Sequence, residues 1–145
     1  MKSFCVFLSP VLLFSAFARG QVLTYGPAAV ELSGTLELQT FPGPPGYESI
    51  HDGDEAERYF YLRLDAPLDI VAMRAHPGIE NAQTERNVRI VQLAIDAEDD
   101  RLWSRFRKAG PGHRVKVEGT LFHQFAGHHH SRVLLSVNKM TTQEH

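Results

Sequence analysis

Val115-Lys-Val-Glu-Gly-Thr-Leu121 is the stretch that decides the fold, together with its earlier echo, Val30-Glu-Leu-Ser-Gly-Thr-Leu36. In both stretches apolar residues alternate with polar ones, which is the pattern of a half-buried β-strand. A glycine inside such a strand indicates a bulge or a sharp bend. Because strongly coiled barrel strands bend in this way, the echo favours a small β-barrel.

Three further strands complete the β-rich pattern. They are predicted over Arg58 to Leu64, over Val88 to Ile95, and over the apolar run that ends at Val137. We expect the run RYFYLRL to end at Asp65-Ala-Pro67. The short apolar piece from Leu68 to Met73 is then a separate edge strand, followed by a polar loop.

One helix is predicted, from Asp96 to Lys108, because its acidic residues lie at the start and its basic residues at the end, as the helix dipole prefers. The element order is therefore three strands, a helix and two strands. This order predicts an all-β fold with one helix, arranged as a five-stranded OB-like barrel. An antiparallel sandwich with one helix is the alternative.

The N-terminal 20 residues have the pattern of a signal peptide, with Lys2 followed by an apolar run and small residues near Ala18. The run is too short to span a bilayer and contains Pro10. We therefore expect an exported protein, periplasmic or secreted, with no membrane span after cleavage. The expected layout is a signal peptide over 1–20, a linker over 21–27, a single domain over 28–140 and a tail over 141–145.

Cysteine content and charge exclude several classes of function. The single cysteine, Cys5, would leave with the signal peptide, which excludes disulfides, thiolate metal sites and cysteine nucleophiles from the mature chain. The 15 basic and 17 acidic residues become 13 and 17 when Lys2 and Arg19 are removed, a net charge of −4. This mild acidity disfavours a nucleic-acid partner, which requires a basic surface.

The loop of the C-terminal hairpin is rich in histidine. His128, His129 and His130 lie within it, and His123 ends the strand before it. Imidazole is a common ligand of divalent metals, so these four histidines are a candidate site for zinc or copper. The alternative is a solvated loop in which one histidine is hydrogen-bonded to the backbone and the others are exposed.

Aromatic residues form a second candidate surface. Phe41 and Tyr47 bracket a stiff proline-rich loop, because its three prolines exclude a central strand or a helix interior. Tyr59 and Tyr61 alternate with Phe60 and should share one face of their strand. These four residues, Phe41, Tyr47, Tyr59 and Tyr61, are candidates for a ligand or partner surface of the kind that OB barrels use, and core packing is the alternative.

No catalytic pattern stands out. The chain has no G-x-S-x-G motif, no glycine-rich phosphate loop and no recognisable carboxylate pair. A metal-assisted hydrolase is the weaker alternative, because it would need a general base that the sequence does not indicate. A protein without enzymatic activity is favoured, and no catalytic residue is assigned.

Three stretches together resemble a bacterial family of small exported proteins described as a domain of unknown function, number 4431. They are Phe41-Pro-Gly-Pro-Pro-Gly-Tyr-Glu-Ser-Ile50, Tyr61-Leu-Arg-Leu-Asp65, and Gly119-Thr-Leu-Phe-His123 with the following Gly-His-His-His and Val-Leu-Leu runs. The family pattern often has threonine where this chain has Ala126 and Ser131. The resemblance implies export and marks the histidine hairpin as a family feature, but it implies no activity.

The sequence therefore predicts an exported, monomeric binding module whose histidine-rich hairpin is the recognition surface. Its ligand is either a divalent metal ion or a protein in the periplasm or outside the cell, for instance an enzyme that this small domain inhibits.

Overall fold

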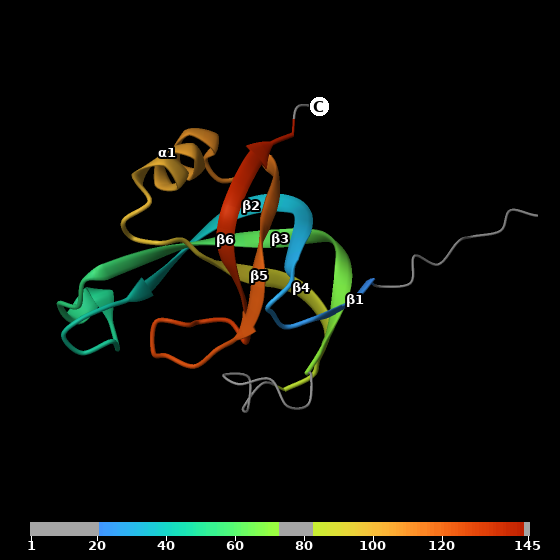
Figure 1. The fold of residues 1–145 in the computed structure, drawn as a ribbon. Helices are drawn as coiled ribbons and strands as arrows, with labels where there is room; N and C mark the ends of the chain where they lie inside the picture. The colour runs from blue at the N-terminus through green and yellow to red at the C-terminus, as the bar shows by residue number, and fades with distance from the viewer. Residues whose placement is uncertain (1–20, 73–82, 144–145) are drawn as a thin grey trace, which may run out of the picture.

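The computed structural model describes residues 21–72 and 83–143. The predicted signal peptide lies outside these residues. In chain order the elements are β1 (Gln21–Thr24), β2 (Ala29–Pro42), the 3₁₀-helix η1 (Ile50–Asp52), β3 (Ala56–Val71), β4 (Glu85–Ala94), α1 (Asp100–Ala109), β5 (Arg114–His123) and β6 (Val133–Thr142) (Figure 1). Within the two described ranges, no helix is long and apolar enough to cross a membrane.

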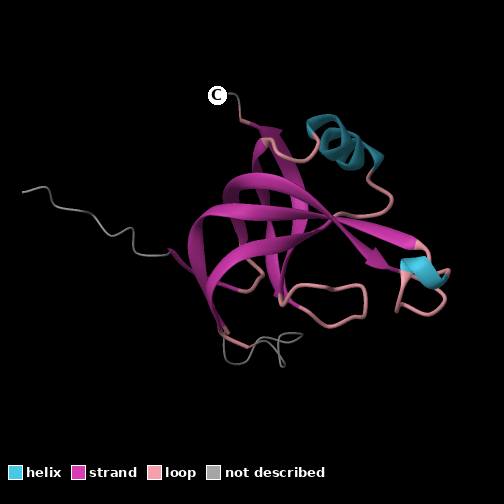
Figure 2. Cartoon of the chain, turned by 180° about the vertical axis from the view of Figure 1, so that it is seen from behind, coloured by secondary structure: helices cyan, strands magenta, loops and turns pink. Residues whose placement is uncertain are grey.

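The strands form one six-stranded mixed sheet in the order β1-β3-β2-β5-β6-β4. β3 also pairs with β4, so β2, β3, β4, β6 and β5 form a ring (Figure 2). The pairs β1–β3 and β4–β6 are parallel and the others are antiparallel. The predicted β-rich fold with one helix is confirmed, and α1 lies between the third and fourth ring strands along the chain.

The two echoing glycines lie where neighbouring strands approach each other closely. Gly34 pairs with β3 on one side and β5 on the other, at the point where β2 changes partner. A Cβ at Gly34 would lie 2.0 Å from the carbonyl oxygen of Arg63, and one at Gly119 would lie 2.1 Å from that of Ser136. A register shift at Glu118 and Gly119 marks the bend in β5. The predicted irregularity is thus found at Gly119, whereas at Gly34 glycine is required by the close approach of the Arg63 carbonyl.

The core fills the ring and is covered at one end by α1. Alternate residues of β5, Val115, Val117 and Leu121, are buried, as a half-buried strand requires. The helix contributes Leu102 and Phe106, and the ring of Phe106 lies 5.4 Å from that of Phe60 between centroids. Asp99 caps the helix by accepting a hydrogen bond from the backbone N–H of Leu102 at 2.9 Å, so α1 begins later than Asp96.

The predicted break at Asp65-Ala-Pro67 is wrong, because β3 runs continuously from Ala56 to Val71. Proline cannot donate to a strand ladder, but Pro67 lies at a register irregularity between Arg63 and Leu68. No ladder bond is therefore lost, and the former edge piece is the second half of β3. Met73 and the start of the loop predicted after it lie outside the described residues.

The segment expected as a linker, residues 21–27, contains β1, which pairs with Leu68–Val71 of β3. Tyr25 follows β1 and is fully buried. Its hydroxyl donates to the carbonyl of Gln83 at 3.1 Å, and burial raises its pKa to about 12. At the other end, β6 extends to Thr142, which the sequence placed in the tail.

Candidate functional site

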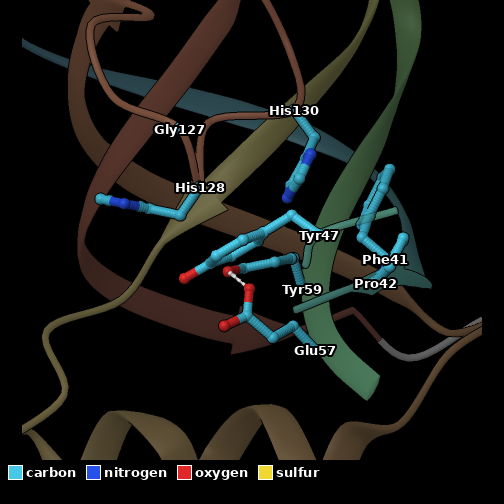
Figure 3. Close-up of a pocket in the computed structure, with 8 residues that line it drawn as sticks. All are labelled: Phe41, Pro42, Tyr47, Glu57, Tyr59, Gly127, His128 and His130. Atoms are coloured by element: carbon cyan, nitrogen blue, oxygen red, sulfur yellow. Dashed lines mark hydrogen bonds between the residues drawn. The ribbon is translucent and has the colours of Figure 1, made fainter. Parts of the chain in front are cut away.

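Two loops of the ring enclose a groove of about 800 Å³. The proline-rich loop, residues 43–55, joins β2 to β3, and the histidine hairpin loop, residues 124–132, joins β5 to β6. The groove is lined by Phe41, Pro42, Tyr47, Glu57, Tyr59, Gly127, His128 and His130 (Figure 3). Strand residues and both loops thus contribute to one surface.

The proline-rich loop is held by the side chain of Asp54. Its carboxylate accepts hydrogen bonds from the backbone N–H groups of Gly46 at 2.7 Å, Glu48 at 2.8 Å and Ser49 at 2.9 Å. These three bonds stabilise the ionised carboxyl group and lower the pKa of Asp54. The loop therefore carries its own anchor.

Tyr47 lies at the tip of this arrangement with a left-handed backbone, φ 58°. This conformation costs a residue with a side chain about 1 kcal/mol, so the surrounding loop must impose it. The Tyr47 N–H donates to the Gly43 carbonyl at 2.9 Å, which closes the turn. The side chain remains 59% exposed and extends into the groove (Figure 3).

The histidine hairpin loop is anchored from another strand, by Gln92 of β4. Gln92 is 2% exposed. Its Nε2 donates to the carbonyl of His128 at 3.0 Å, and its Oε1 accepts from the backbone N–H of His130 at 2.7 Å. A buried amide that satisfies both groups holds the loop backbone against β4, because breaking either bond would leave a buried polar group unpaired.

His129 closes the hairpin loop from within. Its Nδ1 accepts hydrogen bonds from the backbone N–H groups of Phe125 at 3.1 Å and Ala126 at 3.2 Å. Accepting these bonds requires the neutral ring with the proton on Nε2. Partial burial, together with the neighbouring His128 and His130, lowers the pKa of His129, which also favours the neutral ring. The alternative of one histidine bonded to backbone describes this residue.

His130 forms one wall of the groove. Its ring stacks on Phe41 with a centroid distance of 3.9 Å and an interplanar angle of 2°, and it lies 5.2 Å from the ring of Tyr59. Partial burial lowers the pKa of His130, although Glu57 acts in the opposite direction. The stacked imidazole is therefore a neutral aromatic wall at neutral pH.

Glu57 supplies the charge in the groove. The hydroxyl of Tyr59 donates to its Oε2 at 2.6 Å. Burial and this hydrogen bond raise the pKa of Tyr59, so the tyrosine keeps its proton. Glu57 also packs against Gly43, since a Cβ there would lie 2.6 Å from Cγ of Glu57. The carboxylate is thus held from two sides.

The four histidines predicted as metal ligands do not form one cluster, although His128 and His130 line the same groove. His123 does not line the groove; its ring packs edge-on against Tyr25 and its Nε2 lies 3.4 Å from Oε1 of Glu85. In the part of the chain that the structure describes, no three His, Asp or Glu side chains are grouped to hold a metal ion. His129 could bind a metal through Nε2 only by losing its bonds to the loop backbone. Metal binding stays a prediction that requires the loop to rearrange.

Three of the four aromatic candidates line the groove, and the fourth does not. Phe41, Tyr47 and Tyr59 are lining residues. Tyr61 shares their face, with its ring 6.3 Å from that of Phe41, but it is only 2% exposed. Its hydroxyl points to Oε1 of Gln92 at 3.4 Å. Its assignment to the surface is therefore corrected: Tyr61 supports the groove from beneath.

Sequence reasoning missed Gln92 and Glu57 as parts of the site. The signal for Gln92 was a polar residue within the apolar run VRIVQLAI, which is buried on both faces. Glu57 follows an acidic run, Asp52-Gly-Asp-Glu55, from which it does not stand out, although it is the second residue of β3. Its pairing with Phe41 across β2 and β3 brings it to the groove, and no local pattern indicates that pairing.

Residues 90–141 match the family model of a domain of unknown function, DUF4431, which confirms over this range the family that the sequence resembles. The matched range includes Gln92 and the histidine hairpin loop, but it begins after Phe41, Tyr47 and Tyr59. Neither a curated protein nor a solved structure matches the chain. The description of the family names no activity.

Proposed function

With residues 90–141 matched to a family whose description gives no activity, we propose that this protein is an exported binding module that takes its ligand in the groove between the two loops. The observation that carries the proposal is that side chains from separate parts of the chain meet in one groove. Aromatic side chains from β2, β3 and both loops surround a single carboxylate in an 800 Å³ groove. This size and lining are typical of small-ligand sites.

The proposal includes a fold assignment, an OB-like barrel. The ring strands, numbered along the chain from β2, neighbour one another in the order first, second, third, fifth, fourth, and close back to the first. OB barrels bind ligands on the face of the second and third strands and through the loops that join strands one to two and four to five. In this chain those loops are the proline-rich loop and the histidine hairpin loop, which supports the same site.

The test is a screen of a diverse small-molecule fragment library by amide chemical shifts. We expect hits to shift the amides of residues 41–47, 57–59 and 127–130, and Tyr47→Ala to weaken those hits at least about tenfold through loss of a large aromatic contact. Asn138→Ala, a change outside the groove lining, is the control and should leave them unchanged. Hits that map only elsewhere would refute the proposal.

A protein ligand is the second candidate, and exposed aromatic residues on both loops favour it. Phe125 of the histidine hairpin loop is 82% exposed and Tyr47 is 59% exposed, and exposed aromatic residues commonly anchor protein interfaces. A pull-down with the protein should then recover a defined partner, lost in Phe125→Ser and Tyr47→Ala. Recovery that is equal for both variants and the unchanged protein would count against it.

A divalent metal is tested in parallel, because the four histidines motivated it. If zinc or copper is the ligand, micromolar metal raises the melting temperature, and the double change His128→Ala with His130→Ala abolishes the rise. The proposal stops at binding, because the described lining residues include one carboxylate, Glu57, and the described residues group no three side chains that could hold a metal ion.

A further inference from the structure

The walls of the groove present aromatic faces at several angles. His130 is stacked flat on Phe41, and the ring of Tyr59 is tilted by 51° to that of His130. Tyr47 reaches in from the proline-rich loop beside Tyr59 (Figure 3). The faces of such rings carry partial negative charge, which attracts a cation placed over them.

The charge of the groove has one sign. Glu57 is the only charged side chain among the eight lining residues, which include no lysine or arginine. The Tyr59 hydroxyl donates to this carboxylate, and the bond leaves its negative charge in place. The neutral state of His130 adds no positive charge to oppose it.

We infer that the groove binds a small organic ammonium ion, held between the aromatic faces and the carboxylate of Glu57. This inference rests on the proposed binding function and names its ligand class. An anion would face the Glu57 charge without a cationic partner. A neutral ligand would displace water from the carboxylate without supplying an opposite charge, which costs free energy.

A free small molecule fits better than the basic side chain of a protein. The groove volume, about 800 Å³, lies within the range of sites that enclose small ligands. Both of its loops are anchored, one by Asp54 and the other by Gln92, so the groove is formed before the ligand arrives. A preformed site loses little conformational entropy when it binds a small ligand.

The test compares two probes of equal shape. They are 2-hydroxyethyltrimethylammonium and 3,3-dimethylbutan-1-ol, in which a carbon atom replaces the charged nitrogen. We expect amide shifts at residues 41–47, 57–59 and 127–130, and an affinity for the ammonium at least about fivefold higher than for the neutral alcohol. A lysine-containing peptide is titrated alongside.

Variants locate the charge effect. Glu57→Gln should reduce the preference for the ammonium to less than about twofold, while its amide can still accept the Tyr59 hydroxyl. Glu118→Gln is the matched control, because Glu118 lines a separate cleft with Glu31 and Lys116. It should leave the preference unchanged.

The outcomes separate this inference from the proposed function. Equal binding of both probes in the groove would overturn the ammonium assignment and leave the binding function standing. Binding of the peptide without the free ammonium would overturn the small-molecule assignment. Binding of neither probe, with fragment hits in the groove, would refute the ligand class alone, and an empty groove in both screens would refute both.

Discussion

The proline-rich loop and the histidine hairpin loop face each other across the groove, but they are held in different ways. Asp54 anchors the first through three backbone N–H groups of the same loop. Gln92 anchors the second from β4, 36 residues before His128 in the chain. One wall is therefore a local structure, whereas the other depends on the ring being closed.

The strands that carry these loops share one design. β2 and β5 contain the same Gly-Thr-Leu motif, and each has its glycine against the backbone of a neighbouring strand. The difference between the walls therefore arises after the strands end. Three experiments test this difference. The first changes the glycines that both strands share, the second changes the anchor of the hairpin loop alone, and the third compares the two loops as the pH falls.

The largest effect is expected from the shared glycines. Gly34→Ala and Gly119→Ala should each lower the free energy of unfolding by about 3 kcal/mol or more, because the added Cβ overlaps a backbone carbonyl that cannot move without bending the strand. Chemical denaturation measures the change. Gly127→Ala is the control, since nothing lies within 4 Å of its Cβ. If only one of the two substitutions lowered the free energy of unfolding strongly, β2 and β5 would not be equivalent.

A smaller effect, confined to one loop, is expected from the hairpin anchor. Gln92→Leu should lower the free energy of unfolding by about 2 kcal/mol, because it leaves the His128 carbonyl and the His130 N–H without partners. Hydrogen exchange should accelerate at residues 124–132 and remain unchanged at 43–55. Gln124→Leu, a change at an exposed glutamine, should alter neither loop. Equal acceleration in both loops would refute separate anchoring.

The smallest effect is expected from pH, which should loosen the hairpin loop first. The pKa of His129 is lowered below 6.5, so its contribution to stability is complete above that pH and is lost as the pH falls through its folded pKa. The pKa of Asp54 is lowered below 3.8, so its contribution is lost only at more acidic pH. Amide exchange from about pH 8 to pH 3 measures both loops. Loosening of the proline-rich loop near pH 6 would contradict the assignment.

The sequence predicts what local patterns determine. Alternation and the glycine echo indicate β2 and β5, and the charge pattern indicates α1. Pro67 misled the prediction of β3, because a proline breaks a strand only where its N–H would have been used. The parallel pairing of β1 was missed for a related reason: a four-residue strand carries too short a pattern to separate from a linker.

The candidate site was predicted in part for the same reason. Phe41, Tyr47, Tyr59, His128 and His130 were identified by composition, and the groove contains all five. Tyr61 was misplaced because alternation gives the face of a strand but not what covers that face. Gln92 was missed because its role depends on a loop that arrives from β5 and β6.

The anchor at Gln92 binds only backbone atoms of the hairpin loop, the carbonyl of His128 and the N–H of His130. It therefore fixes where this wall stands without specifying which side chains the wall presents. Substitution of the His128 or His130 side chain is therefore expected to leave these two anchoring bonds, and the path of the loop, in place. A library varied at these two positions on the unchanged scaffold is therefore expected to yield grooves of new specificity.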